Sequence, residues 1–202
     1  MSKLKFRYYL LDDKALAPVK ANPTDSGFDV FVHSFKKAWI RGSFKEEMLE
    51  SDERGIIEGI SIPLDGDGTP GQTPKEIRDN LKPHAVVVNP GDRVMMGTGI
   101  KAHVTGDPGK VYELQVRPRS GNATKQGLVV TNTPGTVDDP YRGEICVCIT
   151  NTSGNAQRIT LGDKIAQLVP AEVPMPELEQ VKSPEELGET SRGEDGFGSS
   201  GK

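Results

Sequence analysis

The chain contains few cysteines and few aromatic residues. Cysteine occurs only twice, at Cys146 and Cys148, and aromatic residues make up 5% of the 202 residues. Two cysteines exclude a disulfide-rich scaffold and cannot complete a zinc site alone. They lie two positions apart in a strand-like sequence and therefore share one face, where a disulfide between them would be awkward. We expect reduced, partly buried thiols in a reducing compartment.

Long apolar runs and basic clusters are also missing. No apolar run approaches the roughly 20 residues that a membrane-spanning helix needs. The short apolar stretch near the N-terminus is broken by Asp12 and Asp13, which does not fit a secretory signal. The net charge of −4, without a block of lysine and arginine, argues against a nucleic-acid partner. We expect a cytoplasmic protein that binds neither membrane nor nucleic acid.

Glycine and proline are abundant instead, with 23 and 15 residues. Strand-like segments begin with residues 6–11 and 28–32 and resume from Ala85 onward. Turn signals separate them about every ten residues, which is typical of all-β domains. This rhythm predicts an all-β sandwich, barrel or jelly roll.

Residues 35–82 interrupt the rhythm, and we interpret them as an insertion between two strands. Ser43 followed by Glu46 resembles a capping box and predicts a short helix that ends at Leu49. Thr73, which precedes a proline, predicts a second helix. The insertion therefore contains either a small satellite core or a surface for a protein partner.

A turn-rich loop inside the insertion, residues 65–76, carries acidic residues spaced as in a calcium-binding loop. Pro70 occupies the sixth position, where an EF-hand needs glycine. An ordinary acidic turn is therefore the simpler interpretation of this loop.

Five short segments carry residues suited to chemistry. They are PTDSGFDVF (23–31), RPRSG (117–121), NTPGTVDDPYRGEI (132–145), GDKIAQLV (162–169) and RGEDGFGSSG (192–201). Arg119 and Ser120 end a strand, where they can contact phosphate oxygens. Successive glycine amides in the last segment can form an anion-binding nest. Asp138 can orient a water as a general base. Each feature alone is also what an ordinary turn or tail contains.

Together and in this order, the five segments resemble the five motifs of the trimeric dUTPase family. The resemblance implies a jelly-roll-like β-fold, with residues 1–34 and 83–173 as its body and 35–82 as an inserted, partly helical segment. It implies a homotrimer in which the arm 174–202 completes the active site of a neighbouring subunit. The implied reaction is Mg²⁺-dependent hydrolysis of dUTP to dUMP and pyrophosphate, which keeps uracil out of DNA and supplies dUMP for dTMP synthesis. The location would be the cytoplasm, or the host cytoplasm for a viral or phage enzyme.

The resemblance also assigns roles to residues. Asp138 would position the water that attacks the α-phosphorus, and Gln167 would contact the phosphate chain or that water. Asp29 would hold the Mg²⁺–triphosphate complex through water. The remaining implied substrate-binding residues are Arg119, Ser120 and Gly121 for the phosphates, Asn132, Val137 and Tyr141 for the nucleoside, and Arg192, Phe197, Gly198, Ser199 and Ser200 in the arm.

Two alternatives remain open. dCTP deaminases resemble the family in fold and in the third motif, but no deaminase-type replacement appears at Asp138 or Tyr141. A regulatory protein that had kept the fold would have no reason to retain these residues together with Gln167 and the tail motif. The histidines at 33, 84 and 103 lie in no motif and receive no role.

Overall fold

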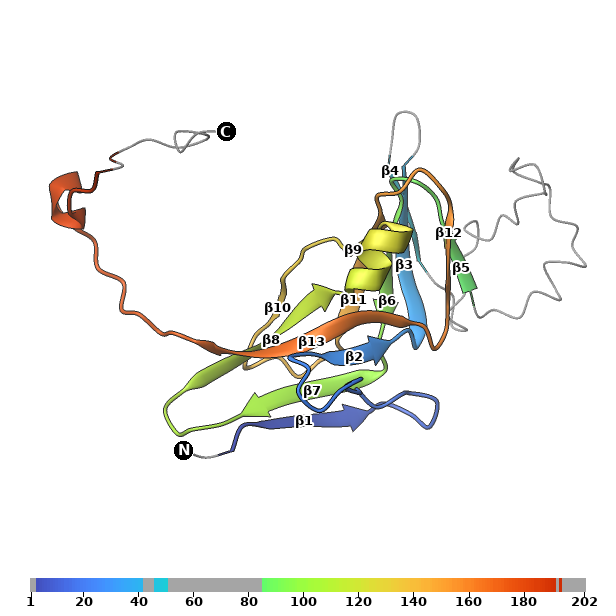
Figure 1. Ribbon diagram of the computed structural model, residues 1–202, viewed down its shortest axis with the longest axis horizontal. Coiled ribbons are helices and arrows are strands. Elements are labelled where there is room, and N and C mark those ends of the chain that lie inside the picture. Colours follow the sequence, from blue (N-terminus) through green and yellow to red (C-terminus); the bar gives the residue numbers. More distant parts are fainter. Residues whose placement is uncertain (1–2, 42–45, 51–84, 192, 194–202) are drawn as a thin grey trace, which may run out of the picture.

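The computed structural model describes residues 3–41, 46–50, 85–191 and 193 of the chain. Short antiparallel strands dominate this part of the molecule (Figure 1). The first half contains β1 (Lys5–Leu10), β2 (Phe28–Phe31), β3 (Ser34–Arg41), β4 (Glu46–Glu50), β5 (Ala85–Val88), β6 (Arg93–Gly97) and β7 (Ile100–Thr105). The second half contains β8 (Val111–Pro118), η1 (Asn122–Gln126), β9 (Leu128–Val130), β10 (Gly135–Val137), β11 (Cys146–Asn151), β12 (Gln157–Thr160), β13 (Lys164–Val173) and η2 (Pro184–Leu187).

The described strands form two larger and two smaller sheets. A five-stranded sheet has the order β4-β3-β6-β11-β9, and a four-stranded sheet has the order β10-β8-β13-β2. The pairs β1-β7 and β12-β5 complete the arrangement. Strands distant in the sequence therefore pair with one another, as in a jelly roll. The predicted all-β, jelly-roll-like fold is confirmed.

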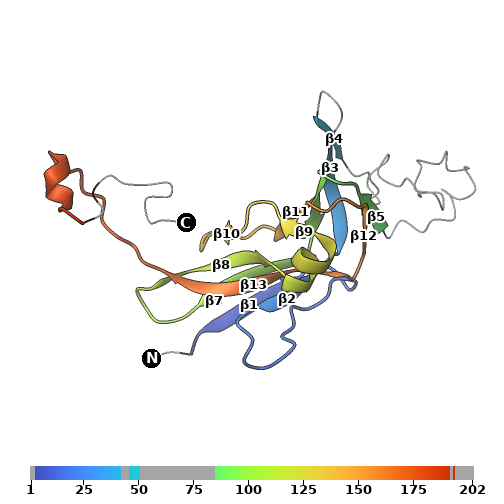
Figure 2. The ribbon, with the colours of Figure 1, turned by 45° about the horizontal axis from the view of Figure 1, so that its top comes forward.

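The core lies between these sheets and is aliphatic. Met96, Ile100 and Leu168 are each 0% exposed, and they come from three different sheets. Along β8, buried residues alternate with half-buried ones from Val111 to Val116, as expected of a strand with one face on the core. β13, which pairs with both β8 and β2, passes across the centre of the molecule when it is turned (Figure 2).

The start of the predicted insertion differs from expectation. β3 continues to Arg41 and pairs with β6, and Phe35 and Ala38 are buried in the core. The helix predicted from Ser43 to Leu49 is wrong, because Glu46–Glu50 is strand β4, paired antiparallel with β3. Backbone hydrogen bonding to an existing sheet edge prevailed over a local capping signal.

Several expectations about this region lie outside the described residues. These are the second insertion helix at Thr73 and the acidic loop 65–76. The sheet therefore extends at least to Arg41, past the expected boundary at residue 34, and the division of the chain into body, insertion and arm stays a proposal. Cys146 and Cys148 lie on β11 without a disulfide between them; Cys146 is exposed, against the expected partial burial, and Cys148 is half-buried, while the reduced state stays a prediction.

After Val173 the chain leaves the sheet as an extended arm that carries η2 (Figure 1). Met175, Leu178 and Leu187 on this arm are 72%, 102% and 77% exposed. Apolar side chains exposed to this degree contribute nothing to the core of their own chain. Within the described residues, no helix is both long and apolar enough to cross a membrane.

Candidate active site

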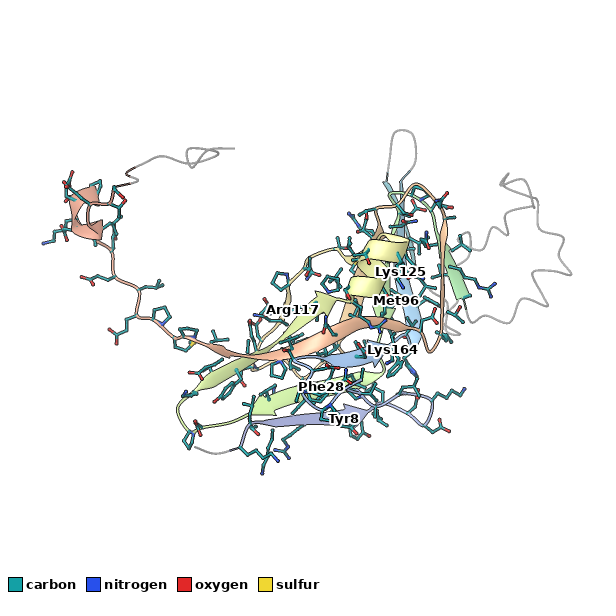
Figure 3. All side chains as sticks on the ribbon, in the orientation of Figure 1. Tyr8, Phe28, Met96, Arg117, Lys125 and Lys164 are labelled. Atoms are coloured by element: carbon teal, nitrogen blue, oxygen red, sulfur yellow. The ribbon has the colours of Figure 1, made fainter. Side chains whose placement is uncertain are left out.

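The first group of predicted residues meets where β8, β13 and β2 lie side by side. Gln167 on β13 is opposite Asp29 on β2 and opposite Arg117 on β8. Arg119 and Ser120 follow directly after β8 ends at Pro118. Three motifs that are far apart in the sequence thus converge at one end of the four-stranded sheet. Lys164 marks this place at the start of β13, beside β2 (Figure 3).

The Asp29 carboxylate is the electrostatic centre of this group. Its Oδ1 accepts a hydrogen bond from Arg119 Nε at 2.9 Å, and its Oδ2 pairs with Lys164 Nζ at 2.9 Å. The Asp29 side chain is 14% exposed, against 30% for Arg119 and 36% for Lys164. The carboxylate therefore orients both cations while they keep contact with solvent, where an anion can approach them.

Asn122 and Gln167 fix the geometry around this ion pair. Asn122 Oδ1 accepts a hydrogen bond from Arg119 Nη1 at 3.3 Å, and Asn122 Nδ2 donates to the Lys164 carbonyl at 3.0 Å. Gln167 Nε2 donates to the carbonyl of Pro118 at 3.0 Å, which ties β13 to the end of β8. We call Asp29, Arg119, Asn122, Lys164 and Gln167 the Asp29 cluster.

Gly27 explains why the Gln167 amide fits here. A Cβ added at Gly27 would lie 2.5 Å from Gln167 Oε1 and 3.1 Å from Gln167 Cβ. Only glycine leaves space for the glutamine side chain at this position. The SGFD segment therefore contributes a close approach of the backbone in addition to its carboxylate.

A short π-helix, η1, begins directly after Ser120 and Gly121. Both residues are exposed, and a Cβ at Gly121 would meet no atom within 4 Å. Thr124 Oγ1 donates to the Ser120 carbonyl at 2.7 Å and thereby secures the turn. The Ser120 hydroxyl thus lies on a fixed backbone beside the Asp29 cluster and is open to a ligand.

A polar recess of about 210 Å³ opens next to η1. Its lining residues are Arg119, Asn122, Gln126, Leu128, Arg158, Ile159, Asp163, Lys164 and Ile165. Sequence reasoning missed Asn122, Arg158 and Lys164 as members of this region. Lys164 was detectable, because it lies inside the GDKIAQLV segment, whereas nothing in the sequence places Arg158 of β12 near η1.

The second group of predicted residues lies on the segment around β10. Asn132 precedes β10 and lies close to Gly135, where an added Cβ would be 3.1 Å from Asn132 Nδ2. Val137 packs against the core, and the Asp138 side chain that follows it is exposed. The Asp138 carbonyl accepts a hydrogen bond from the Tyr141 amide at 3.0 Å and closes a turn. We call residues 137–144 the Asp138 turn.

Tyr141 is the large aromatic residue of the Asp138 turn. Its hydroxyl donates to the carbonyl of Glu144 at 2.7 Å, while the residue as a whole is 45% exposed. The hydroxyl end lies against the backbone, where partial burial raises the pKa of Tyr141 and keeps the donor protonated. The ring is fixed at its tip and presents surface to solvent.

The neighbours of Tyr141 hold it in this position. A Cβ at Gly143 would lie 2.4 Å from the Tyr141 hydroxyl, so this residue must be small. Glu144 Oε1 accepts a hydrogen bond from the Gly99 amide at 2.9 Å, and Glu144 Oε2 pairs with Lys36 at 3.1 Å. Glu144 therefore anchors the end of the turn to β3 and to the connection between β6 and β7.

The Asp29 cluster and the Asp138 turn are well separated within one chain. β10 and β2 lie at opposite edges of the four-stranded sheet. The two regions are also displaced along the strands, because Val137 is opposite Leu114 of β8 whereas Asp29 lies at the level of Arg117 of β8. Strand spacing of roughly 4.8 Å and a rise of about 3.4 Å per residue place Asp29 and Asp138 about 20 Å apart. One phosphate group cannot contact both regions of the same chain.

The described residues offer little direct ligation for a metal ion. Among them, no group of three or more histidine, cysteine, aspartate and glutamate side chains is arranged to bind a metal. Asp29 supplies a carboxylate, but both of its oxygens are engaged by cations. This donor set fits a magnesium ion that keeps its waters and is brought by phosphate, since Mg²⁺ retains several waters in such sites.

The predicted arm residues Arg192, Phe197, Gly198, Ser199 and Ser200 lie outside the described residues. The structure therefore brings together Asp29, Arg119, Ser120, Gly121 and Gln167 in one region, and Asn132, Val137, Asp138 and Tyr141 in another. The roles assigned to all of these residues stay predictions.

Known proteins that this chain resembles are dUTPases. The dUTPase family model matches residues 80–201. The deoxyuridine 5′-triphosphate nucleotidohydrolase of Fusobacterium nucleatum is 39% identical over 146 residues, covering 72% of this chain and 92% of that protein. The corresponding protein of Nautilia profundicola is 47% identical over 117 residues, covering 58% of this chain and 78% of that protein.

Solved structures show the same fold at lower identity. The dUTPase of Staphylococcus bacteriophage 80alpha with dUpNHpp has a TM-score of 0.62 and 23% identity, covering 98% of both chains. The dUTPase of phage phi11 of S. aureus, solved to visualise its species-specific insert, has a TM-score of 0.55 and 20% identity, covering 89% of this chain and 97% of that one. From the family model and the curated relatives, this chain belongs to the dUTPase family of dUTP diphosphatases.

Proposed function

We propose that this protein hydrolyses dUTP to dUMP and pyrophosphate. The observation that carries the proposal is the fixed pair of cations at Asp29, beside the exposed Ser120 hydroxyl, on a chain that also presents an exposed carboxylate at Asp138. The first region suits a polyphosphate, and the second suits a water nucleophile. Membership of the dUTPase family supports dUTP as the nucleotide.

In the proposed reaction, Asp138 accepts a proton from a water molecule that attacks the α-phosphorus. The bond between the α-phosphorus and the oxygen bridging to the β-phosphorus breaks, and pyrophosphate leaves with the electron pair. Ser120 binds around the bridge between the α and β phosphates, where negative charge grows, and Arg119 and the Gly121 amide contact phosphate oxygens. Gln167 lies against the same group and contacts the phosphate chain or the attacking water.

The Asp138 turn also supplies the proposed nucleoside pocket. Asn132 and the backbone of β10 read the uracil edge, and Val137 borders the base. The Tyr141 ring packs beneath the deoxyribose and leaves no space for a 2′-hydroxyl. The hydrogen bond from its hydroxyl to Glu144 supports this role, because a ring fixed at its tip excludes an extra oxygen more effectively than a mobile one.

Magnesium is proposed as the cofactor, held by the triphosphate and by Asp29 through water. Mg²⁺ would neutralise phosphate charge and orient the chain of phosphates. The structure of the phi11 phage dUTPase describes a structural Mg(II) ion in that protein. In this chain Arg119 and Lys164 share the Asp29 carboxylate, so Asp29 would orient a hydrated ion without replacing its waters.

We infer that each active site is shared between subunits of a homotrimer. The separation of about 20 Å within one chain supports this, because Asp138 and Ser120 must contact one α-phosphate and its attacking water. The exposed apolar residues of the arm support an extension onto another subunit. Arg192, Phe197 and the Gly198–Gly201 stretch would then close over the phosphates and the uracil ring.

Pyrophosphate release with Mg²⁺ tests the proposal, with dUTP compared to UTP, dTTP and dCTP. Fast release from dUTP and little from the other three supports the assignment. Ammonia release from dCTP would move the protein to the deaminases. A folded trimer that releases pyrophosphate from none of the four would contradict the proposed reaction and favour a regulatory role.

A further inference from the structure

The Asp138 turn is anchored on most of its length, but the Asp138 carboxylate is not. That side chain is exposed and makes no side-chain hydrogen bond within the described part of the chain. Two sets of hydrogen bonds hold the backbone around it. The Tyr141 amide donates to the Asp138 carbonyl, and Arg142 Nη1 donates to the carbonyls of Asp139 and Tyr141. These contacts are all made inside the turn itself.

Glu144 joins the end of the turn to Lys36 of β3 and to the Gly99 amide, and a second contact joins the turn next to Asp138 to another sheet. His103 Nε2 lies 2.9 Å from Asp139 Oδ1, and the two side chains are 27% and 43% exposed. His103 is on β7, which pairs with β1, whereas Asp139 directly follows Asp138. The pair closes one side of a hollow lined by Ala102, His103, Val104, Tyr112, Glu113, Leu114, Val137, Asp138 and Asp139.

Other charged groups near this pair do not replace it. Arg7 is opposite His103 in the β1–β7 register, and Glu113 and Asp138 line the same hollow. Arg142 approaches the turn through backbone carbonyls. Among the described residues, the His103–Asp139 contact is thus the side-chain link between the Asp138 turn and β7.

We propose that His103 is a positioning residue for hydrolysis, acting through Asp139 to fix the turn that aims Asp138 at its water. The inference rests on the proposed role of Asp138. A donor at Nε2 holds the Asp139 carboxylate, and this fixes the adjacent Cα of Asp138 against the sheet. A displacement of a catalytic group by about 1 Å can cost about 100-fold in rate, so one tether next to the base has a large effect.

The test compares single and double variants at the two positions. His103→Ala should lower kcat about tenfold or more while the Kd for dUpNHpp changes less than about twofold. His103→Gln places an amide donor near the original Nε2 and should restore kcat to within about twofold of the unaltered protein. Asp139→Ala should lower kcat as much as His103→Ala, and the double variant should lose no more than either single one.

Controls separate this effect from general loosening. Lys110→Ala breaks an exposed ion pair, at 2.8 Å, between the turn before β8 and Glu172 on β13, and it should leave kcat unchanged. Thermal unfolding and trimer mass show whether each variant is folded. If His103→Ala proves unstable, the comparison of His103→Gln with Asp139→Ala still measures the tether, because only the second variant removes the hydrogen bond.

The outcomes distinguish this inference from the proposed reaction. An unaltered kcat in His103→Ala, or losses that add in the double variant, would overturn the positioning role. A loss in Asp139→Asn as large as in Asp138→Asn would overturn it too, since Asp139 would then be the base. If Asp138→Asn itself remained active, the proposed reaction would fail regardless of His103.

Discussion

The Asp29 cluster and the Asp138 turn present their chemistry in opposite ways. In the Asp29 cluster, charges from three strands compensate each other, and the central carboxylate is only 14% exposed. In the Asp138 turn, the carboxylate is exposed, and order comes from backbone hydrogen bonds and from Tyr141 and Glu144. In the proposed reaction, the first region binds the phosphates in the ground state, and the second holds a group that acts on bound substrate.

This contrast predicts different kinetic signatures. A residue that contacts the substrate equally in the ground state and in the transition state changes KM, whereas a group used only in the transition state changes kcat. Variants of the Asp29 cluster should therefore weaken binding, and variants of the Asp138 turn should slow turnover at nearly unaltered affinity.

The largest expected effect belongs to Asp138→Asn. Loss of a general base costs typically about 10² to 10⁴ in rate, so kcat should fall within or below that range. The amide is almost isosteric and the side chain is exposed, so stability should be unaltered. Single-turnover hydrolysis and titration with dUpNHpp measure the two properties separately. An equal loss of rate and affinity would contradict the water-positioning role.

Arg119→Gln should give the reverse pattern. Removal of the charge weakens phosphate binding, since charge-assisted contacts to phosphate are about twice as strong as neutral ones, and KM should rise about tenfold or more. Lys164 still pairs with Asp29, so the loss of stability should be near 1 kcal/mol. Arg117→Gln is the matched control, because Arg117 is exposed and its side chain bonds only to Gln115 among the described residues. If Arg119→Gln lowered kcat and left KM unaltered, the predicted kinetic difference between the Asp29 cluster and the Asp138 turn would be contradicted.

Gly143→Ala should reduce sugar discrimination with little cost to the fold. The added Cβ would lie 2.4 Å from the Tyr141 hydroxyl, and the half-exposed ring can move away. We expect the preference for dUTP over UTP in kcat/KM to fall about tenfold, as for a change of one small group in a pocket. Gly154→Ala is the control, because a Cβ there meets nothing within 4 Å. Unchanged discrimination would mean that Tyr141 does not border the sugar.

The smallest expected effect concerns the Tyr141 hydroxyl at high pH. Partial burial raises the pKa of Tyr141 above its ordinary value of 10.0. The folded state therefore binds the proton more tightly than the unfolded state. The contribution of this hydroxyl to stability is complete below pH 10 and is lost as pH rises through the folded pKa. Thermal melts of the unaltered protein and of Tyr141→Phe should run parallel below pH 9 and converge above pH 10. Melts that stay parallel to pH 11 would exclude this titration.

Sequence reasoning succeeded where the signal was periodic or where a motif was complete. The strand rhythm after Ala85 predicted the β-fold, and Asp29, Arg119 and Gln167 converge as their motifs required. It failed at Ser43–Leu49, where a local capping signal lost to pairing with β3. It did not find Arg158 beside η1 or the contact of His103 with Asp139, because neither residue lies in a motif and their neighbours are set by the pairing of distant strands.

Complementation between inactive variants tests the shared site most directly. One variant carries Asp138→Asn, and the other carries Arg119→Gln with Ser120→Ala. Each is nearly inactive alone. After unfolding and random reassembly in equal amounts, about a quarter of all sites, which is one of the three sites in each mixed trimer, should combine an intact Asp138 turn with an intact Asp29 cluster from another subunit. Activity near that fraction is the predicted result. Mixed trimers that stay as inactive as their parents would contradict the account, because both regions would then have to serve the substrate from one chain.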